Sequence, residues 1–255
     1  MLAEAVYRQS PVSANAARDP ADAPNRSSGR VIGRRRREAD EAVTATGESA
    51  RSGRHYAGRT PEERAGRRRE RLLAAALELY GTQGYRGTSI EQLCAGASIS
   101  TRSFYEEMGS QENLLIALAD SIATEAAVAL AALRVDPALP LATRIALAFR
   151  AYFEVTCRDK KTARVCFVEV IGVSPAVEQW RARWRARMGE VLLSNTQPAI
   201  DSGEVVAGDY RLFIVAVLGA VNSLAQELAM ADNPPTIDEI CTELAAFISA
   251  RIAAA

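Results

Sequence analysis

The chain has 255 residues, of which 48% are apolar, which suits a packed core and excludes a wholly disordered chain. Its longest run free of polar side chains, residues 212–221, is much shorter than the roughly 18–20 residues of a membrane span, so no membrane partner is expected. The net charge is zero, yet residues 26–71 carry +7 and residues 72–255 carry −6, an asymmetry that indicates a polyanionic partner.

The residue types needed for catalysis or metal binding are scarce. The one histidine is His55, and the four cysteines are widely spaced: Cys94, Cys157, Cys166 and Cys241. This spacing argues against a zinc site or a disulfide framework and favours the reducing cytoplasm. With no strand before a glycine-rich loop and no Glu-x-x-His pair, we expect no enzyme, cofactor or metal.

Residues 1–59 are rich in Ala, Arg, Ser, Asp and Gly, and they include a run of four arginines at 34–37. Such a segment buries too little apolar surface to fold, so we predict a disordered basic arm. It is either a solvated tail, a stretch upstream of the true start codon, or an arm that binds phosphates without sequence preference.

Ordered structure is predicted to begin abruptly at residue 60. Thr60, Pro61 and Glu63 form a capping box with proline at the first helical position. Apolar residues then recur at helical spacing over 72–80, until Gly81 and Gly84 end the run.

Two short helices are predicted next. The first begins with a capping box in either of two registers, Thr88 with Glu91 or Ser89 with Gln92. Ser100 can cap the second, residues 101–108, in which Phe104 and Met108 are spaced to pack inward. Ser110 then caps a long helix from residue 111.

Three helices of this length and order are typical of a helix-turn-helix, whose last helix enters the major groove of DNA. The outer face of residues 101–108 would carry Thr101, Arg102, Ser103 and Tyr105. An arginine can bind a guanine edge through two hydrogen bonds, and a helix N-terminus at Thr88 or Ser89 favours a phosphate. The alternative is a plain three-helix core without any nucleic-acid role.

Residues 67–115, which include RRRERLLAAALELYGTQGYRG and TSIEQLCAGASISTRSFYEEMGSQENLL, resemble the DNA-binding domain of TetR-type transcription regulators. The resemblance implies DNA contacts at Thr88, Ser89, Ser100, Thr101, Arg102, Ser103, Tyr105 and Gln111. Three positions depart from the family pattern: Ser98 replaces a glycine, Met108 an aromatic residue, and Gln111 a lysine that touches phosphate. Glutamine there should weaken the salt-dependent part of binding, unless the arginines before Thr60 or those at 67–69 compensate.

The rest of the chain reads as helices over about 141–157, 162–171, 175–192, 209–230 and 236–252, with no alternating strand pattern. We therefore predict an all-α fold. Residues 1–59 would be the disordered arm, 60–110 the helix-turn-helix domain, and 111–255 a helical-bundle domain for ligand binding and dimerisation.

Residues 212–221 are apolar on every side of a helix, which indicates burial all round. Small residues in or beside this run permit close helix approach, and we predict a two-fold interface with the last helix, formed by Ala216, Gly219, Ala220, Ser223, Leu244 and Ile248. The alternative is the central helix of a monomeric bundle.

Aromatic residues gather in the second half of the chain: Phe149, Tyr152, Phe153, Phe167, Trp180, Trp184 and Phe213. They are either ordinary core residues or, as the family resemblance implies, the frame of an apolar ligand cavity. Four arginines at alternating positions, Arg181, Arg183, Arg185 and Arg187, spread around a helix and predict a solvated face.

These features favour a cytoplasmic homodimeric regulator, by resemblance a repressor, that binds a palindromic operator in double-stranded DNA. A small, mostly apolar effector would release it by shifting the long helix from Gln111. An enzyme lacks the residues for catalysis, and a helical adaptor that binds only protein would leave the basic front unexplained.

Overall fold

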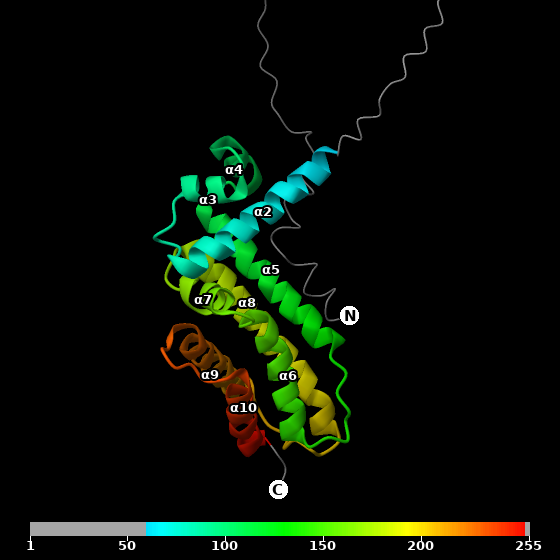
Figure 1. Ribbon diagram of the computed structural model, residues 1–255. Helices are drawn as coiled ribbons and strands as arrows, with labels where there is room; N and C mark the ends of the chain where they lie inside the picture. The colour runs from blue at the N-terminus through cyan, green and yellow to red at the C-terminus, as the bar shows by residue number, and fades with distance from the viewer. Residues whose placement is uncertain (1–59, 253–255) are drawn as a thin grey trace, which may run out of the picture.

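The computed structural model describes residues 60–252, and this part of the chain is helical without a β-strand. The predicted all-α fold is therefore confirmed for these residues, whereas the predicted arm of residues 1–59 lies outside them. Figure 1 shows α3 and α4 at one end of the molecule and α9 and α10 toward the other. The helices are α2 (Pro61–Thr82), α3 (Ile90–Ala97), α4 (Thr101–Met108), α5 (Gln111–Ala132), α6 (Leu141–Thr156), α7 (Lys160–Arg164), the π-helix η1 (Val165–Glu169), α8 (Pro175–Asp201), α9 (Arg211–Met230) and α10 (Ile237–Ile252).

The start of α2 has the predicted capping box. The Glu63 backbone N–H donates to the Thr60 hydroxyl at 3.2 Å, and the Thr60 N–H donates to the Glu63 carboxylate at 3.0 Å. Leu72, Ala76 and Tyr80 are then fully buried along one side of the helix.

The cap of α3 is Ser89, which settles the register that the sequence left open. The Gln92 N–H donates to the Ser89 hydroxyl, and the Gln92 side chain accepts from the Ser89 N–H at 2.8 Å. After α3 the chain turns at Ser98, whose φ of +52° lies in the left-handed region that a glycine adopts more easily.

Two hydrophobic cores hold the described residues together. The first joins α2, α3 and α4 to the N-terminal half of α5, η1 and the start of α8. The second lies among α6, α7, η1, α9 and α10. The first core therefore extends past residue 110, where the sequence predicts a domain boundary.

Two helices, α5 and α9, are long and apolar enough to cross a membrane when judged by length and composition alone. Neither helix contains an uninterrupted apolar run of that length, because polar residues such as Asp120 in α5 and Asn222 in α9 interrupt their apolar sequences. In the most apolar stretch of each helix, 56% of α5 but only 22% of α9 is buried. The first value is expected of a central core helix, whereas α9 leaves an apolar face uncovered.

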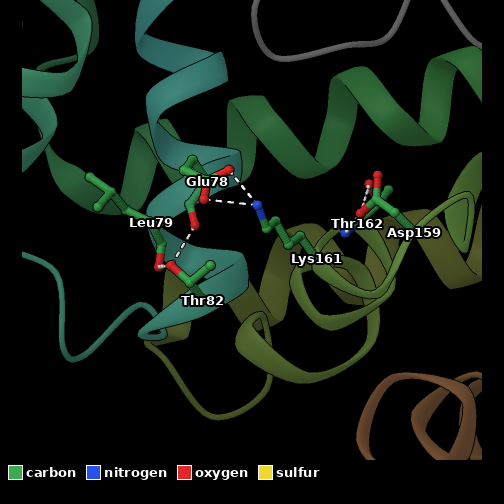
Figure 2. Close-up of polar contacts among 6 residues, drawn as sticks. All are labelled: Glu78, Leu79, Thr82, Asp159, Lys161 and Thr162. Atoms are coloured by element: carbon green, nitrogen blue, oxygen red, sulfur yellow. Dashed lines mark hydrogen bonds and ion pairs between the residues drawn. The ribbon is translucent and has the colours of Figure 1, made fainter.

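The segment after α6 differs from the continuous helix predicted over 162–171. It begins earlier, at Lys160, where the Asp159 carboxylate accepts the Thr162 N–H at 2.8 Å (Figure 2). At Val165 the hydrogen-bonding pattern widens to that of a π-helix, a rare arrangement that occurs mostly as short bulges and often at functional sites.

Helix α7 packs closely on the end of α2. Lys161 reaches across to the Glu78 carboxylate, with Nζ–O distances of 2.6 and 2.8 Å (Figure 2). Gly81 makes this approach possible, because a Cβ atom at this position would lie 2.8 Å from the Lys161 Cα and closer still to its Cβ.

Two glycine-to-alanine substitutions in α2 should therefore have opposite effects. Gly81→Ala should lower the free energy of unfolding by about 1–3 kcal/mol, because overpacking outweighs the better helix propensity of alanine. Gly66→Ala should raise it by roughly 0.5–1 kcal/mol, since no atom lies within 4 Å of the added methyl group. Urea denaturation followed by circular dichroism measures both, and stabilisation by Gly81→Ala would contradict the close packing of α2 on α7.

Candidate nucleic-acid interface and effector cavity

The polar face of α4 is turned away from the protein. Phe104 is fully buried and Met108 is 6% exposed, as their spacing predicted. Thr101, at the start of the helix, and Arg102 and Tyr105 are exposed. An eight-residue helix with one apolar and one polar side thus presents hydroxyl and guanidinium groups to solvent.

The start of α4 adds two serines to this face. Ser100 caps the helix, since its hydroxyl accepts the Ser103 N–H at 3.1 Å and lies 3.0 Å from the Ser103 hydroxyl. Ser100 is exposed and Ser103 half-buried. The N-terminal turn of α4 holds no acidic residue, so nothing in that turn repels a phosphate.

Arg102 is the cation of this surface, with 88% of its side chain exposed. Its Nε donates to the Glu106 carboxylate at 2.8 Å, and this hydrogen bond raises the pKa of Arg102. Glu107, the neighbouring acid, is paired with Arg68 of α2 and half-buried. If Arg102 bound the edge of a base, its hydrogen bond to Glu106 would have to break. Glu107 would keep its own partner, Arg68.

Thr88 and Gln111, both predicted DNA contacts, are engaged inside the protein. Thr88 is only 6% exposed, and its hydroxyl donates to the Gly84 carbonyl at 2.8 Å. The Gln111 Nε2 donates to the carbonyls of Tyr85 and Thr88 at 3.2 and 2.9 Å. These two side chains therefore hold the turn before α3, which leaves the exposed Ser89 as the hydroxyl at the start of that helix.

The arginines of α2 that could have replaced the missing lysine are mostly directed at other parts of the protein. Arg68 pairs with Glu107, Arg69 donates to the Met108 sulfur at 3.8 Å, and Arg71 donates to the Ser98 carbonyl at 3.4 Å. These three arginines connect α2 with α4 and with the turn that precedes α4. The sequence showed a basic cluster but not which way its side chains turn.

A cavity of about 430 Å³ lies among α5, α6, η1, α8 and α9, within the size range of small-molecule sites. Most of its lining is apolar, and five of the seven predicted aromatic residues border it. The other two do not, since Phe153 is fully buried in the second core and Phe213 packs against Phe247 with ring centroids 5.7 Å apart. The five that border the cavity are Phe149, Tyr152, Phe167, Trp180 and Trp184.

The predicted solvated face of α8 needs a correction. Arg183 is exposed, and the Arg187 guanidinium lies 5.9 Å from the centre of the Trp184 ring. Arg181 and Arg185, by contrast, border the cavity together with Arg144 of α6. Positions four apart share a helix face, so the alternating run contributes two residues to the cavity.

The π-helix η1 connects the cavity with the turn before α3. Cys166, Phe167 and the following Val170 border the cavity. On its other side, the Glu169 carboxylate accepts the Tyr85 backbone N–H at 2.7 Å and the Arg164 Nε at 2.7 Å.

Arg164 completes this contact. Its Nη1 donates to the Thr82 carbonyl, the last residue of α2, at 2.8 Å. We call Arg164 and Glu169 the junction pair. The junction pair thus links η1 to the end of α2 and to the turn before α3.

The predicted dimer residues of α9 and α10 fall into two groups that differ in solvent exposure. Ala216, Gly219 and Ser223 are exposed, and Ala220 is half-buried. Leu244 and Ile248 are 1% and 7% exposed in the second core and are not on the surface, which corrects the prediction for α10. Large exposed apolar side chains that the sequence analysis missed continue the uncovered face: Leu212, Val215, Met230 and Phe247.

Comparison with known proteins agrees with this geometry. Residues 72–118 match the family model described as bacterial regulatory proteins, tetR family. The HTH-type transcriptional repressor NicS of Pseudomonas putida is 35% identical over 78 residues, which is 31% of this chain and 37% of that repressor. The match thus covers little more than a third of this relative.

Solved structures extend the similarity to most of the described fold. The transcriptional regulator FadR from Bacillus subtilis, in complex with stearoyl-CoA, has a TM-score of 0.60 at 17% identity, covering 70% of this chain and 96% of FadR. The TetR-family regulator PfmR from Thermus thermophilus has a TM-score of 0.57 at 21% identity, covering 71% and 98%. The family model thus matches the helix-turn-helix segment, and beyond it the described fold is similar to the folds of TetR-family regulators.

Proposed function

We propose that the protein is a DNA-binding transcription regulator that acts as a repressor. It binds a palindromic operator as a homodimer in the cytoplasm and leaves it when a small, mostly apolar effector enters the cavity. The single observation that carries this proposal is the outward polar face of α4, held by the buried Phe104 and Met108. The similarity to a named repressor supports the direction of regulation.

The DNA contacts we propose are the exposed or half-exposed groups at the starts of α3 and α4: Ser89, Ser100, Thr101, Arg102, Ser103 and Tyr105. Arg102 is the base-reading residue, since guanidinium matches the two acceptors of a guanine edge. The hydroxyl groups and helix N-termini would bind phosphate oxygens and set the position of α4. Thr88 and Gln111 keep an indirect role through the turn that they hold.

A second protomer is the occupant that we propose for the uncovered face of α9 and α10. Leu212 is 85% exposed and Val215 is 65% exposed, which is costly for side chains of this size in water. No atom lies within 4 Å of a Cβ built on Gly219, so a partner helix can approach closely there. In such a two-fold pair the two α4 helices would bind half-sites about 34–36 Å apart, one turn of DNA.

The effector would act through η1 and the junction pair. An occupied cavity presses on Phe167 and Val170, which lie in the same short segment as Glu169. Movement of Glu169 displaces the Tyr85 backbone and with it the start of α3. The stearoyl-CoA complex of FadR supports a ligand within a fold of this kind. A coupling free energy of about 1–3 kcal/mol between the two sites is typical of such systems.

The role of Arg102 can be tested with labelled duplexes of the gene's own upstream region and of scrambled sequence. Arg102→Ala should reduce the preference for the upstream duplex roughly five- to hundredfold, because one bidentate base contact is lost. Fluorescence anisotropy over a salt series measures both affinities. Arg134→Ala, which removes an exposed arginine beyond α5, should leave the preference unchanged. Equal losses on both duplexes would contradict base reading by Arg102.

The proposed dimer face can be tested with two valines of similar exposure. Val215→Glu should convert the dimer to a monomer at micromolar concentration, because it buries a charge in an apolar interface. Val128→Glu, at a position of α5 that is 51% exposed, should leave the dimer intact. Sedimentation velocity distinguishes the two states. A monomeric unmodified chain, or a dimer that tolerates Val215→Glu, would refute this interface.

The junction pair can be tested through the Tyr85 amide. Glu169→Gln should lower the free energy of unfolding by about 1–3 kcal/mol, because a neutral amide replaces the charged acceptor of two hydrogen bonds. Deuterium exchange at Tyr85 should also become faster. Glu190→Gln, at an exposed position of α8, serves as the control. Unchanged exchange at Tyr85 would mean that Glu169 does not hold the turn.

A further inference from the structure

The charge around the cavity is one-sided. Among the described residues that border it are three arginines, Arg144, Arg181 and Arg185, and no aspartate or glutamate. The nearby buried acid, Asp120, is outside the lining and accepts the Trp180 indole N–H at 3.1 Å. The remaining polar groups of the lining are neutral. Burial raises the pKa of the Cys166 thiol, so this lining residue also adds no negative charge.

The acids that neutralise these arginines leave part of the positive charge uncompensated. Arg144 is paired with Glu204 of the loop between α8 and α9. Glu178 receives two hydrogen bonds from Arg181, at 2.8 and 2.9 Å, but both use the same nitrogen, Nη1. A guanidinium has five N–H donors, so Nε and Nη2 of Arg181 keep the capacity to bind another acceptor. One carboxylate, Glu178, thus faces two cations, Arg181 and Arg185.

Glu178 itself stays ionised. The Gly172 backbone N–H donates to its carboxylate at 2.9 Å, and this bond, followed by the Arg181 contact, lowers the pKa of Glu178. It therefore offers no proton to a ligand. An anionic group beside it is favoured only because Arg181 and Arg185 together exceed its charge.

The two arginines occupy different depths. Only 17% of the Arg181 side chain is exposed, so its guanidinium is not simply extended into water, whereas Arg185 is exposed. Farther along α8 the cavity is bordered by Met188, Val191 and Leu192. At 1.5 Å per residue, about 10 Å of helix separates Arg185 from Leu192. The wall formed by α8 thus changes from cationic at Arg181 and Arg185 to apolar over 188–192, beyond which its polar residues are neutral.

We propose that the cavity binds a long-chain amphiphile with an anionic head group. This inference rests on the proposed effector site and names its ligand class. The head lies against Arg181 and Arg185, where charge-assisted hydrogen bonds replace its water, and the chain extends past Met188. At roughly 30 Å³ for each water-sized group, about 430 Å³ holds a chain of about a dozen carbons. A carboxylate and a phosphate are the two head groups that this arrangement suits.

The chain's two tryptophans, Trp180 and Trp184, both border the cavity, so intrinsic fluorescence reports occupancy without any DNA. The full chain would be titrated with dodecanoate, dodecyl phosphate, dodecanol and dodecylammonium, all below their micelle-forming concentrations. At least one of the two anions should bind about tenfold or more tightly than dodecanol, and the ammonium most weakly. The comparison of the two anions identifies the preferred head group.

Three variants assign the effect to the named arginines. The double variant R181Q/R185Q should bind the anion and dodecanol with similar affinity, whereas R183Q, on the outer side of the same helix, should keep the preference. Circular dichroism checks that each variant is folded. Equal binding of anion and alcohol by the unmodified chain, binding of none of the four probes, or equal loss in R183Q would overturn the proposal.

The test of the ligand class can be distinguished from the test of the proposed regulation. Operator binding is measured in parallel on the same samples with and without the best-bound probe. An anion that binds but does not release DNA leaves the ligand class standing and contradicts the effector role. If the protein binds the operator but none of the probes, the proposed DNA-binding function stands and the proposed ligand class is contradicted.

Discussion

Burial of Phe104 and Met108 determines the direction in which the other side chains of α4 point. These two residues lie one turn apart and join the first core with α2 and α3. Full burial of an apolar side chain of this size is worth about 1.5–3 kcal/mol. The exposed Arg102–Glu106 pair contributes far less, because solvent screens it. The apolar side of α4 therefore fixes the orientation of the helix. Contacts on its polar face, such as the Arg102–Glu106 pair, can be replaced by contacts to a ligand at little cost in stability.

The same core connects this helix with the rest of the molecule. Val165, which begins η1, and Val170, which follows it, pack into the first core, while Phe167 belongs to the second. A π-helix places its side chains at a different angular spacing from an α-helix, so one short segment can serve both cores. The junction pair then fixes the last carbonyl of α2 and the backbone of Tyr85. A few hydrogen bonds of the junction pair thus connect the segment that borders the cavity with the turn before α3.

Local signals made much of this fold predictable. The capping groups Thr60, Ser100 and Ser110 all act as their sequence patterns predicted, because a cap depends on residues within one helical turn. The register at Thr88 and Ser89 was ambiguous because both hydroxyls satisfy the same local pattern. Packing decided it by burying Thr88. The outward face of α4 followed from spacing alone, whereas its DNA contacts stay a proposal.

Features that depend on distant segments could not be read from the sequence. The Gln111 amide could face a phosphate or the turn before α3, and only the position of that turn relative to α5 decides between them. Arg181 and Arg185 belong to an alternating run that shows no preferred face, and only the packing of α8 with the other helices of the lining shows that they border the cavity. Leu244 and Ile248 were assigned to a surface because apolar residues that face a core and those that face a partner look alike in one sequence.

The most direct measurement is methylation interference on the upstream duplex, because N7 of guanine is the major-groove atom that an arginine reads. If α4 of each protomer enters the major groove, methylation should block binding at two clusters of guanines about 10 base pairs apart, and Arg102→Ala should remove this interference. Binding that falls with salt but ignores guanine methylation everywhere would show that the outward face of α4 does not read DNA.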